Sequence, residues 1–248
     1  MERCDFLPVS AEEMHERGWW WYDALVVSGD AYVDHPSFGT SVISRVLEAE
    51  GLRVAVLAQP DWHDAEAFRA MGRPRLGVFI GAGNLDSMVA HYTAAKRRRS
   101  EDFYSPGKRS GCRPDRAAIV YCNRAREAFG PDMPIILGSL EASLRRFAHY
   151  DYWDDSVRRA ILFDAPADLL VYGMGEAATI EIAHRLKKKQ SVRTMTDIPG
   201  TGYITRDPSV CKFDHITLPS FEDVRDDKRL YAEATRTEYA EHDPIRGR

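Results

Sequence analysis

Residues 24–58 read ALVVSGDAYVDHPSFGTSVISRVLEAEGLRVAVLA, and this stretch decides the fold. It begins with a short apolar run, Ala24 to Ser28, of the kind found in buried strands. After a polar loop, residues 40–50 place apolar side chains at helical spacing, and Gly51 supplies a helix stop. A second apolar run, residues 53–58, completes the unit. Two buried strands joined by a helix predict a parallel pair with a right-handed crossover.

The alternation of strand-like and helical segments continues along the chain. Three further apolar runs are strand-like, at residues 76–81, 135–138 and 168–172. Helical spacing lies between or after them, at residues 64–71, 84–97 and 177–187. Repeated units of this kind predict an α/β fold, in which a doubly wound, mostly parallel five-stranded sheet carries helices on both faces.

The pattern divides the chain into three parts. Residues 1–18 are interpreted as a helical lead-in and residues 19–190 as the α/β domain. Beyond residue 190 the apolar periodicity fades, so residues 191–248 are interpreted as an irregular extension. Within the extension we expect a turn beside a short strand near residues 198–204 and a helix over about 220–240.

Composition limits the partners that the chain can have. Of its 248 residues, 44% are hydrophobic and 29% charged, which is usual for a globular protein. Because the formal net charge is −4, no overall field favours nucleic acid, and we expect no nucleic-acid partner. The N-terminus lacks the apolar core of a signal peptide, and no run approaches the roughly 20 apolar residues of a membrane span. The chain is therefore expected in the cytoplasm, away from membranes.

One segment departs from this average charge. Residues 96–116 read KRRRSEDFYSPGKRSGCRPDR and are basic and rich in turn formers. The simpler interpretation is a long solvated loop. The other interpretation is an arm that contacts phosphate or nucleic acid.

The cysteines give no metal motif. The chain has four, at Cys4, Cys112, Cys122 and Cys211, and no two of them lie two or three residues apart. Zinc and iron–sulfur sites usually contain at least one such close pair. We therefore expect separate reduced thiols and no metal ligands in this chain.

A second unusual stretch, residues 135–159, reads IILGSLEASLRRFAHYDYWDDSVRR. Charges, aromatic rings and one histidine crowd together directly after a predicted strand, where open α/β sheets bind ligands. This favours a ligand site, and the alternative is a solvated helix that packs Phe147, Tyr150 and Trp153 onto the sheet. Arg145 and Arg146 are expected on the helix after the fourth strand, where adjacent side chains point about 100° apart. At most one of them should then face a cleft, while the other pairs with an acid such as Asp151 or Asp155.

The predicted topology brings the loops after all parallel strands to one edge of the sheet. Their polar residues are the candidate ligand-binding set: Asp30, His35, Asp61, Asn84, Asp86, Glu141, Arg145, His149 and Glu176. Residues 81–84 (GAGN) resemble part of a dinucleotide fingerprint but lack its third glycine and follow the third strand, so a dinucleotide site is rejected. From these residues alone, the sequence predicts a ligand-binding α/β module.

Seven motifs in this chain carry a resemblance to a known family. They are SGDAYVDHPSFG (28–39), AQPDW (58–62), GNLDSM (83–88), RPDR (113–116), EASLRR (141–146), HYDYW (149–153) and YGMGE (172–176). From about Trp19 to its end, the chain resembles the N-terminal domain of the YgiQ-type radical-SAM protein family. The fold that this implies resembles a flavodoxin-like or cobalamin-binding-type domain.

The resemblance also implies cofactors and a partner. In the full-length family, a barrel with a three-cysteine motif holds a [4Fe–4S] cluster and binds S-adenosylmethionine. That motif is absent from this chain, so none of its cysteines is assigned as a cluster ligand. The chain is expected to be the front part of a longer enzyme: a fragment, a truncated reading frame or one half of a split gene. The barrel would lie in the same or a neighbouring reading frame.

Cobalamin is a further implied ligand. The Asp-x-His-x-x-Gly signature of histidine-ligated cobalamin domains is absent, because three residues separate His35 from Gly39 and position 33 is valine. Two alternatives follow. Either cobalamin is held without a histidine ligand, or the domain kept the fold without the cofactor.

Three functions follow from these observations. The leading hypothesis is an accessory domain of a radical-SAM enzyme of unassigned reaction, which covers the barrel mouth, helps to form the pocket of a small-molecule substrate and is not catalytic alone. The second is a stand-alone module that binds cobalamin or a nucleotide-like ligand. The third is a hydrolase or transferase that uses Asp30, Asp34 and His35 together with residues 145–155.

Overall fold

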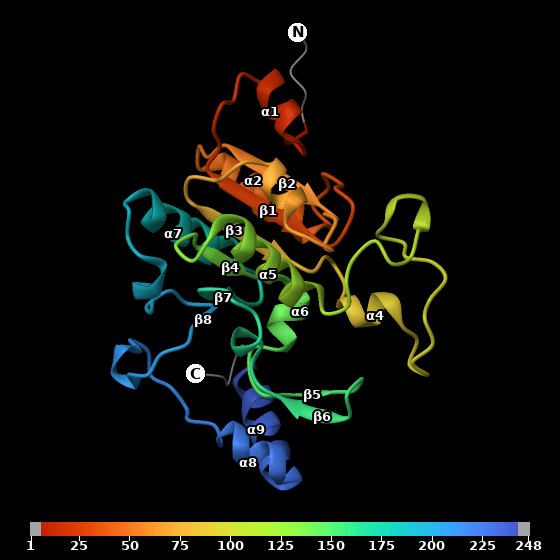
Figure 1. The fold of residues 1–248 in the computed structure, drawn as a ribbon. Coiled ribbons are helices and arrows are strands. Elements are labelled where there is room, and N and C mark those ends of the chain that lie inside the picture. The colour runs from red at the N-terminus through yellow and green to blue at the C-terminus, as the bar shows by residue number, and fades with distance from the viewer. Residues whose placement is uncertain (1–5, 243–248) are drawn as a thin grey trace.

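A computed structural model describes residues 6–242 and has a six-stranded sheet at its centre (Figure 1). The strands lie in the order β2-β1-β3-β4-β7-β8. Five are parallel: β1 (Ala24–Ser28), β2 (Val54–Ala58), β3 (Gly77–Gly81), β4 (Ile135–Leu137) and β7 (Leu169–Val171). The sixth, β8 (Thr201–Gly202), pairs antiparallel with β7. The predicted parallel sheet is confirmed, and the short strand expected near residues 198–204 extends it.

The five parallel strands are mostly apolar because both faces of the sheet are covered. All five residues of β1 are buried, and alternate side chains enter two separate cores. Leu25 and Val27 point to one core, where Tyr121 also lies. Val26 and Phe79, which are partners in the strand register, point to the other. A strand covered on both faces reads as a continuous apolar run, which is why the sequence located these strands well.

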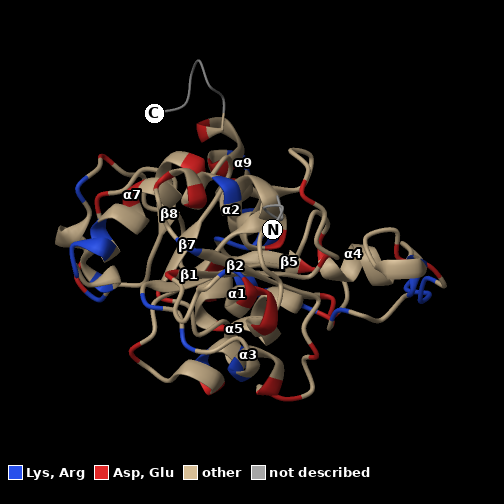
Figure 2. Cartoon of the chain, turned by 90° about the horizontal axis from the view of Figure 1, so that it is seen from above, with Lys and Arg blue, Asp and Glu red and all other residues tan. Residues whose placement is uncertain are grey.

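Two pairs of helices supply the covering layers, as Figure 2 shows from above. On one face lie α2 (Gly39–Ala49) and α7 (Glu176–Lys187), which contact each other. On the opposite face lie α3 (Glu66–Ala70) and α5 (Ala117–Phe129). Helices on both faces confirm a doubly wound sheet. Helix α5 was not predicted, although Ala117, Tyr121, Ala125 and Phe129 recur at four-residue spacing and are all buried.

The other elements surround this sandwich. The helices are α1 (Ala11–Glu16), α4 (Ser87–His91), α6 (Ser139–Leu144), α8 (Phe221–Asp226) and α9 (Lys228–Glu241). A separate antiparallel hairpin is formed by β5 (His149–Asp151) and β6 (Ser156–Arg158). Single 3₁₀ turns occur at η1 (Pro106–Lys108), η2 (Ile161–Phe163), η3 (Val192–Thr194) and η4 (Pro208–Val210).

Three predicted helices need correction. The helix expected over residues 84–97 is only α4, because Asp86 caps it and the chain becomes extended at Tyr92. The block at 141–159 is not one helix: α6 ends at Leu144 and the β5–β6 hairpin follows. The helix expected over 220–240 is divided in two, because Asp227 is extended and its side chain accepts the Arg229 N–H as the cap of α9.

Candidate functional site

The carboxyl edge of the sheet is where the loops after β1, β3, β4 and β7 meet. Strand β1 has β2 on one side and β3 on the other, so the chain reverses its direction of winding beside β1. In doubly wound sheets with this strand order, a crevice opens at such a switch point, outside the carboxyl ends of the strands. The edge divides into an open half and a closed half.

The open half is a cavity of about 340 Å³ on the α2/α7 side of the sheet. Its floor is apolar, because Val26, Phe79 and Ile136 contribute strand side chains to it. Its rim is built from small residues and from the first residues of α2 and α7: Gly39, Thr40, Gly81, Gly83, Asn84, Gly138, Ser139, Gly173, Met174, Gly175 and Glu176. Such a lining suits an uncharged, flat or apolar group approached by backbone N–H groups.

Two glycines make this half possible. At Gly175 an added Cβ would lie 2.7 Å from Val171 Cγ1, so a side chain there would collide with the end of β7. At Gly173 the backbone has φ +69°, a left-handed conformation that favours glycine. Between them, the Met174 side chain is 92% exposed at the mouth of the cavity. The YGMGE motif therefore shapes the rim.

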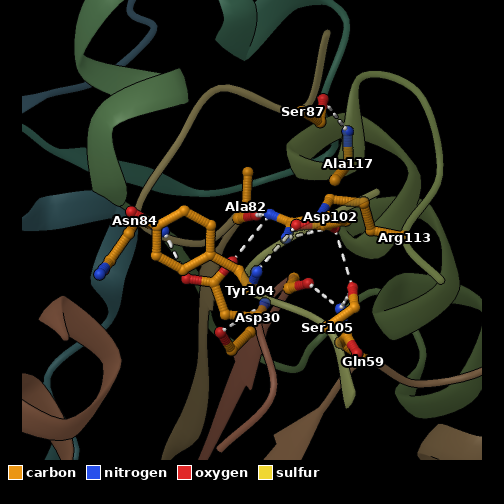
Figure 3. Close-up of polar contacts among 12 residues, drawn as sticks. Asp30, Gln59, Ala82, Asn84, Ser87, Asp102, Tyr104, Ser105, Arg113 and Ala117 are labelled. Atoms are coloured by element: carbon orange, nitrogen blue, oxygen red, sulfur yellow. Dashed lines mark hydrogen bonds and ion pairs between the residues drawn. The ribbon is translucent and has the colours of Figure 1, made fainter. Parts of the chain in front are cut away.

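The closed half is filled by Arg113, which is 1% exposed (Figure 3). Its guanidinium lies 2.8 Å from an oxygen of Asp30 and 2.8 Å from an oxygen of Asp102, and it donates to the Ala82 carbonyl at 3.2 Å. Both carboxylates are buried as well. Asp30 comes from the loop after β1 and Ala82 from the loop after β3, so this arginine joins two loops at the switch point.

The two carboxylates that flank Arg113 accept further hydrogen bonds. Asp30 accepts the Asn84 N–H at 2.7 Å, and Asp102 accepts the Ser105 hydroxyl at 2.9 Å. Burial raises the pKa of Asp30, although the Arg113 charge and the Asn84 N–H act in the opposite direction. The network holds the long 92–116 segment against the sheet edge, and one Asp30 oxygen is held there by the Arg113 ion pair without a hydrogen bond.

Three other predicted site residues form a second internal network. Glu141, 1% exposed, accepts the backbone N–H groups of Ser87 at 2.9 Å and Ala118 at 3.0 Å, so one carboxylate serves the starts of two helices. Burial raises its pKa. Asp86 caps α4 through the Met88 N–H at 3.0 Å and also pairs with Arg145. These charges hold α4, α5 and α6 together.

The remaining predicted residues lie apart from one another. His35 is exposed, and its Nδ1 lies 2.6 Å from the Ser37 hydroxyl. Asp61 is exposed and lies 2.6 Å from His63, whose backbone N–H and ring lower the pKa of that carboxyl. His149 lies on β5 with Nδ1 3.1 Å from the Phe147 carbonyl, and burial lowers its pKa.

The structure brings together only part of the predicted set. Asn84 and Glu176 line the open cavity, and Asp30 lies directly beneath Asn84. Asp61 borders a different, shallower hollow with Gln59 and Cys112, and His149 borders neither. Sequence reasoning missed Arg113 and the apolar floor, although RPDR (113–116) was among the family motifs.

The expected partners of the paired arginines need correction. Arg145 faces Asp86, and Arg146 lies 2.6 Å from Glu238 of α9 rather than pairing with Asp151 or Asp155. Asp151 instead pairs with Arg116 at 3.0 Å. The catalytic loop of the third hypothesis is also divided, because Asp34 pairs with Arg45 while His35 contacts Ser37.

The described cysteines do not fit a metal cluster. Cys122 belongs to α5 and is fully buried in the core, and this burial raises the pKa of its thiol. Within residues 6–242, no group of three or more His, Cys, Asp or Glu side chains could hold a metal ion. Over the same residues, no helix is long and apolar enough to span a membrane.

Comparison with known proteins identifies relatives that are much longer. A UPF0313 protein of Clostridium botulinum (strain 657) is 54% identical over all 248 residues, and one of Clostridium perfringens (strain SM101) is 52% identical. The chain spans only 38% and 37% of their lengths. Among solved structures, the radical S-adenosylmethionine methyltransferase TsrM from Kitasatospora setae, with cobalamin and a [4Fe–4S] cluster bound, aligns with a TM-score of 0.47 and 20% identity. That alignment covers 74% of this chain and 27% of TsrM.

A family model extends over almost the whole chain. The model described as "Radical SAM N-terminal" matches residues 6–248, the same region in which the seven motifs lie. The resemblance predicted from the sequence is thereby confirmed, and the chain belongs to the radical SAM N-terminal family.

Proposed function

We propose that this chain is the accessory N-terminal domain of a radical-SAM [4Fe–4S] enzyme and that its open cavity forms one wall of the substrate pocket. The cluster and S-adenosylmethionine would be held by a barrel in the same longer protein, which would supply the radical chemistry. The observation that carries the proposal is the cavity of about 340 Å³ at the carboxyl edge of β1, β3, β4 and β7. It is open, small-residue-lined and positioned where this topology binds ligands.

The surface around the cavity supports a covering partner. Leu140 and Leu144 of α6 are 44% and 60% exposed, and Phe147, Tyr172 and Met174 are exposed beside them. Exposed apolar side chains that gather at one edge indicate a surface that another part of a protein covers. A barrel placed here would exclude water from the cavity and place its own reacting groups opposite the apolar floor.

A second candidate function is a stand-alone module for cobalamin or a nucleotide-like ligand. The specific observation in its favour is that the first turns of two long helices, α2 and α7, both border the cavity. Free N–H groups at helix starts favour phosphate and other anionic groups. On this hypothesis the chain alone binds the ligand, and no covering domain is needed.

A pair of variants at Gly39 tests both functions. Gly39 lies at the rim, and an added Cβ meets no atom within 4 Å, so Gly39→Ala leaves the cavity open whereas Gly39→Trp obstructs its mouth. In the longer protein, prepared anaerobically, we expect Gly39→Trp to abolish retention of small molecules seen by native mass spectrometry, and Gly39→Ala to preserve it.

Two further outcomes separate the candidates. For the accessory domain, backbone amides of residues 140–147 and 172–175 exchange with deuterium more slowly in the longer protein than in this chain alone. For the stand-alone module, hydroxocobalamin or adenosine raises the melting temperature of this chain, and Gly39→Trp cancels the rise. Equal exchange in both proteins, with ligands unaffected by Gly39→Trp, would refute the proposed pocket.

A further inference from the structure

The segment between α4 and α5 forms a basic arm, defined here as residues 92–112. Six exposed cations lie on it: Lys96, Arg97, Arg98, Arg99, Lys108 and Arg109. Figure 2 shows blue, for Lys and Arg, on the segment that projects beyond α4. The net charge of −4 for the whole chain conceals this local excess of positive charge.

The basic arm is folded rather than extended. In its first turn, the Arg99 N–H bonds to the His91 carbonyl at 2.7 Å and the Thr93 N–H to the Arg97 carbonyl at 2.8 Å. In its second turn, the Asp102 N–H bonds to the Lys108 carbonyl at 3.0 Å. These bonds order the backbone that carries the cations, so less backbone entropy is lost when a ligand binds.

The cations of the basic arm differ from arginines elsewhere in the chain. Arg113, Arg116, Arg126, Arg145 and Arg158 each lie near at least one carboxylate in an ion pair. Across residues 6–242, none of the six arm cations has a carboxylate oxygen within 4.0 Å. Lys96 Nζ donates to the Trp153 carbonyl and Arg99 Nε to two backbone carbonyls, but among the described residues no carboxylate in contact neutralises these charges.

Aromatic rings accompany the cations at both turns. At the first, Lys96 Nζ lies 4.8 Å from the Tyr152 ring, which in turn lies 5.4 Å from Trp153. At the second, Lys108 Nζ lies 4.9 Å from the ring of Phe103, which is 73% exposed. Tyr152 is about half exposed as well. Each turn thus presents positive charge beside an accessible flat ring.

We propose that the basic arm, together with Tyr152 of the neighbouring hairpin, binds single-stranded nucleic acid. Phosphates would lie against the six cations, and unpaired bases would stack on Phe103 and Tyr152. Unstacked bases on aromatic rings beside a basic groove are the recurrent mode of single-strand recognition. An acidic peptide would satisfy the charges but would not use the accessible surfaces of the two rings. The inference does not depend on the proposed function of the cavity.

Fluorescence anisotropy on the full chain tests the proposal, with 12-nucleotide single-stranded RNA and DNA as probes at several salt concentrations. The arm variant Arg97→Ala/Arg98→Ala/Lys108→Ala removes three cations whose side chains cap no helix. We expect binding to weaken at least tenfold at low salt and the slope of log affinity against log salt to fall by about 2. Phe103→Ala should weaken binding about tenfold with the slope unchanged.

A matched control removes three exposed cations that lie outside the basic arm. In Lys188→Ala/Arg206→Ala/Arg236→Ala we expect affinity within twofold of the unmodified chain. Circular dichroism verifies that every variant folds. Comparing the RNA probe with the DNA probe shows whether the 2′-hydroxyl contributes to binding affinity. Absence of binding, equal loss in the control variant, or tighter binding to polyglutamate or to phosphatidylglycerol vesicles than to either oligonucleotide would overturn the proposal.

Discussion

The two halves of the carboxyl edge are built from the same strands, but one is filled by buried charged side chains and the other is open. In the closed half, Asp30, Arg113 and Asp102 bury charge and hold the loops after β1 and β3 together. In the open half, glycines and apolar strand ends leave a cavity. The contrast teaches that conspicuous charged residues at this edge maintain its shape, whereas inconspicuous small residues provide the space for a ligand.

The largest expected effect on stability comes from removing the buried cation of the closed half, Arg113. Arg113→Met preserves side-chain length but leaves Asp30 and Asp102 buried without their shared cation. Because removing one partner leaves uncompensated buried charge, we expect a loss of about 3–5 kcal/mol in the free energy of unfolding at pH 7, measured by urea denaturation. Arg97→Met, an exposed cation on the basic arm, should change stability by less than about 0.5 kcal/mol.

The pH dependence of that loss gives a second readout. The pKa of Asp30 is already raised by burial, so its contribution to stability is complete below its unfolded pKa and is lost as pH rises through the folded pKa. Without Arg113 that pKa should rise further, so the penalty in Arg113→Met should be smaller at pH 4 than at pH 7. A penalty under about 1 kcal/mol, or one independent of pH, would contradict a structural role for this charge network.

The next largest effect on stability is expected at a glycine of the closed half, Gly29, and is compared with a glycine of the open half, Gly39. A Cβ added at Gly29 would collide with the backbone carbonyl of Ala82, where the loops after β1 and β3 approach most closely. We expect Gly29→Ala to lower the free energy of unfolding by about 3 kcal/mol, because backbone must move. At Gly39 an added Cβ meets no atom within 4 Å, so Gly39→Ala should be neutral within about 0.5 kcal/mol. Equal melting temperatures for the two variants would contradict the difference in packing between Gly29 and Gly39.

The sequence predicted the scaffold better than the loops for a physical reason. Buried parallel strands are continuous apolar runs bounded by glycine, so all five were found from local pattern. Helix α5 also had a local signal, the buried spacing of Ala117, Tyr121 and Ala125, which went unrecognised beside a basic loop. Two helix boundaries were missed although their caps are local, since Asp86 accepts the Met88 N–H and Asp227 accepts the Arg229 N–H.

The site was harder to predict because its organisation is non-local. Charge density suggested that Glu141 and Arg145 face a ligand, but their partners come from segments distant in the sequence and turn both residues inward. These partners are Asp86, Ser87 of α4 and Ala118 of α5. Arg113 sits in a turn-rich segment that looks solvated, and only the folded sheet edge makes it interior. The cavity floor consists of strand residues that carry no chemical signal of their own.

The smallest expected effect lies at the start of α5, outside the closed half, where an ion pair is only partly buried. Asp151 lies 3.0 Å from Arg116 of the α5 cap and also accepts the Trp153 N–H at 2.8 Å. Burial of Asp151 acts to raise the pKa of its carboxyl, but the Arg116 hydrogen bond and two backbone N–H groups outweigh it, and the pKa is lowered. A lowered carboxyl pKa contributes stability that is present above the unfolded pKa and lost as pH falls through the folded pKa.

Asp151→Asn measures that contribution, because the amide oxygen can still accept the Trp153 N–H while the charge is removed. We expect a loss of about 1 kcal/mol in the free energy of unfolding at pH 7 and pH 6, and this loss should diminish as pH falls through the folded pKa of Asp151. Asp154→Asn is the matched control, since Asp154 also contacts Arg116 but is about half exposed, and it should change stability very little. A difference between Asp151→Asn and the unmodified chain that grows as pH falls would have the wrong sign for this ion pair. It would indicate that the pKa of Asp151, like that of the buried Asp30, is raised in the folded protein.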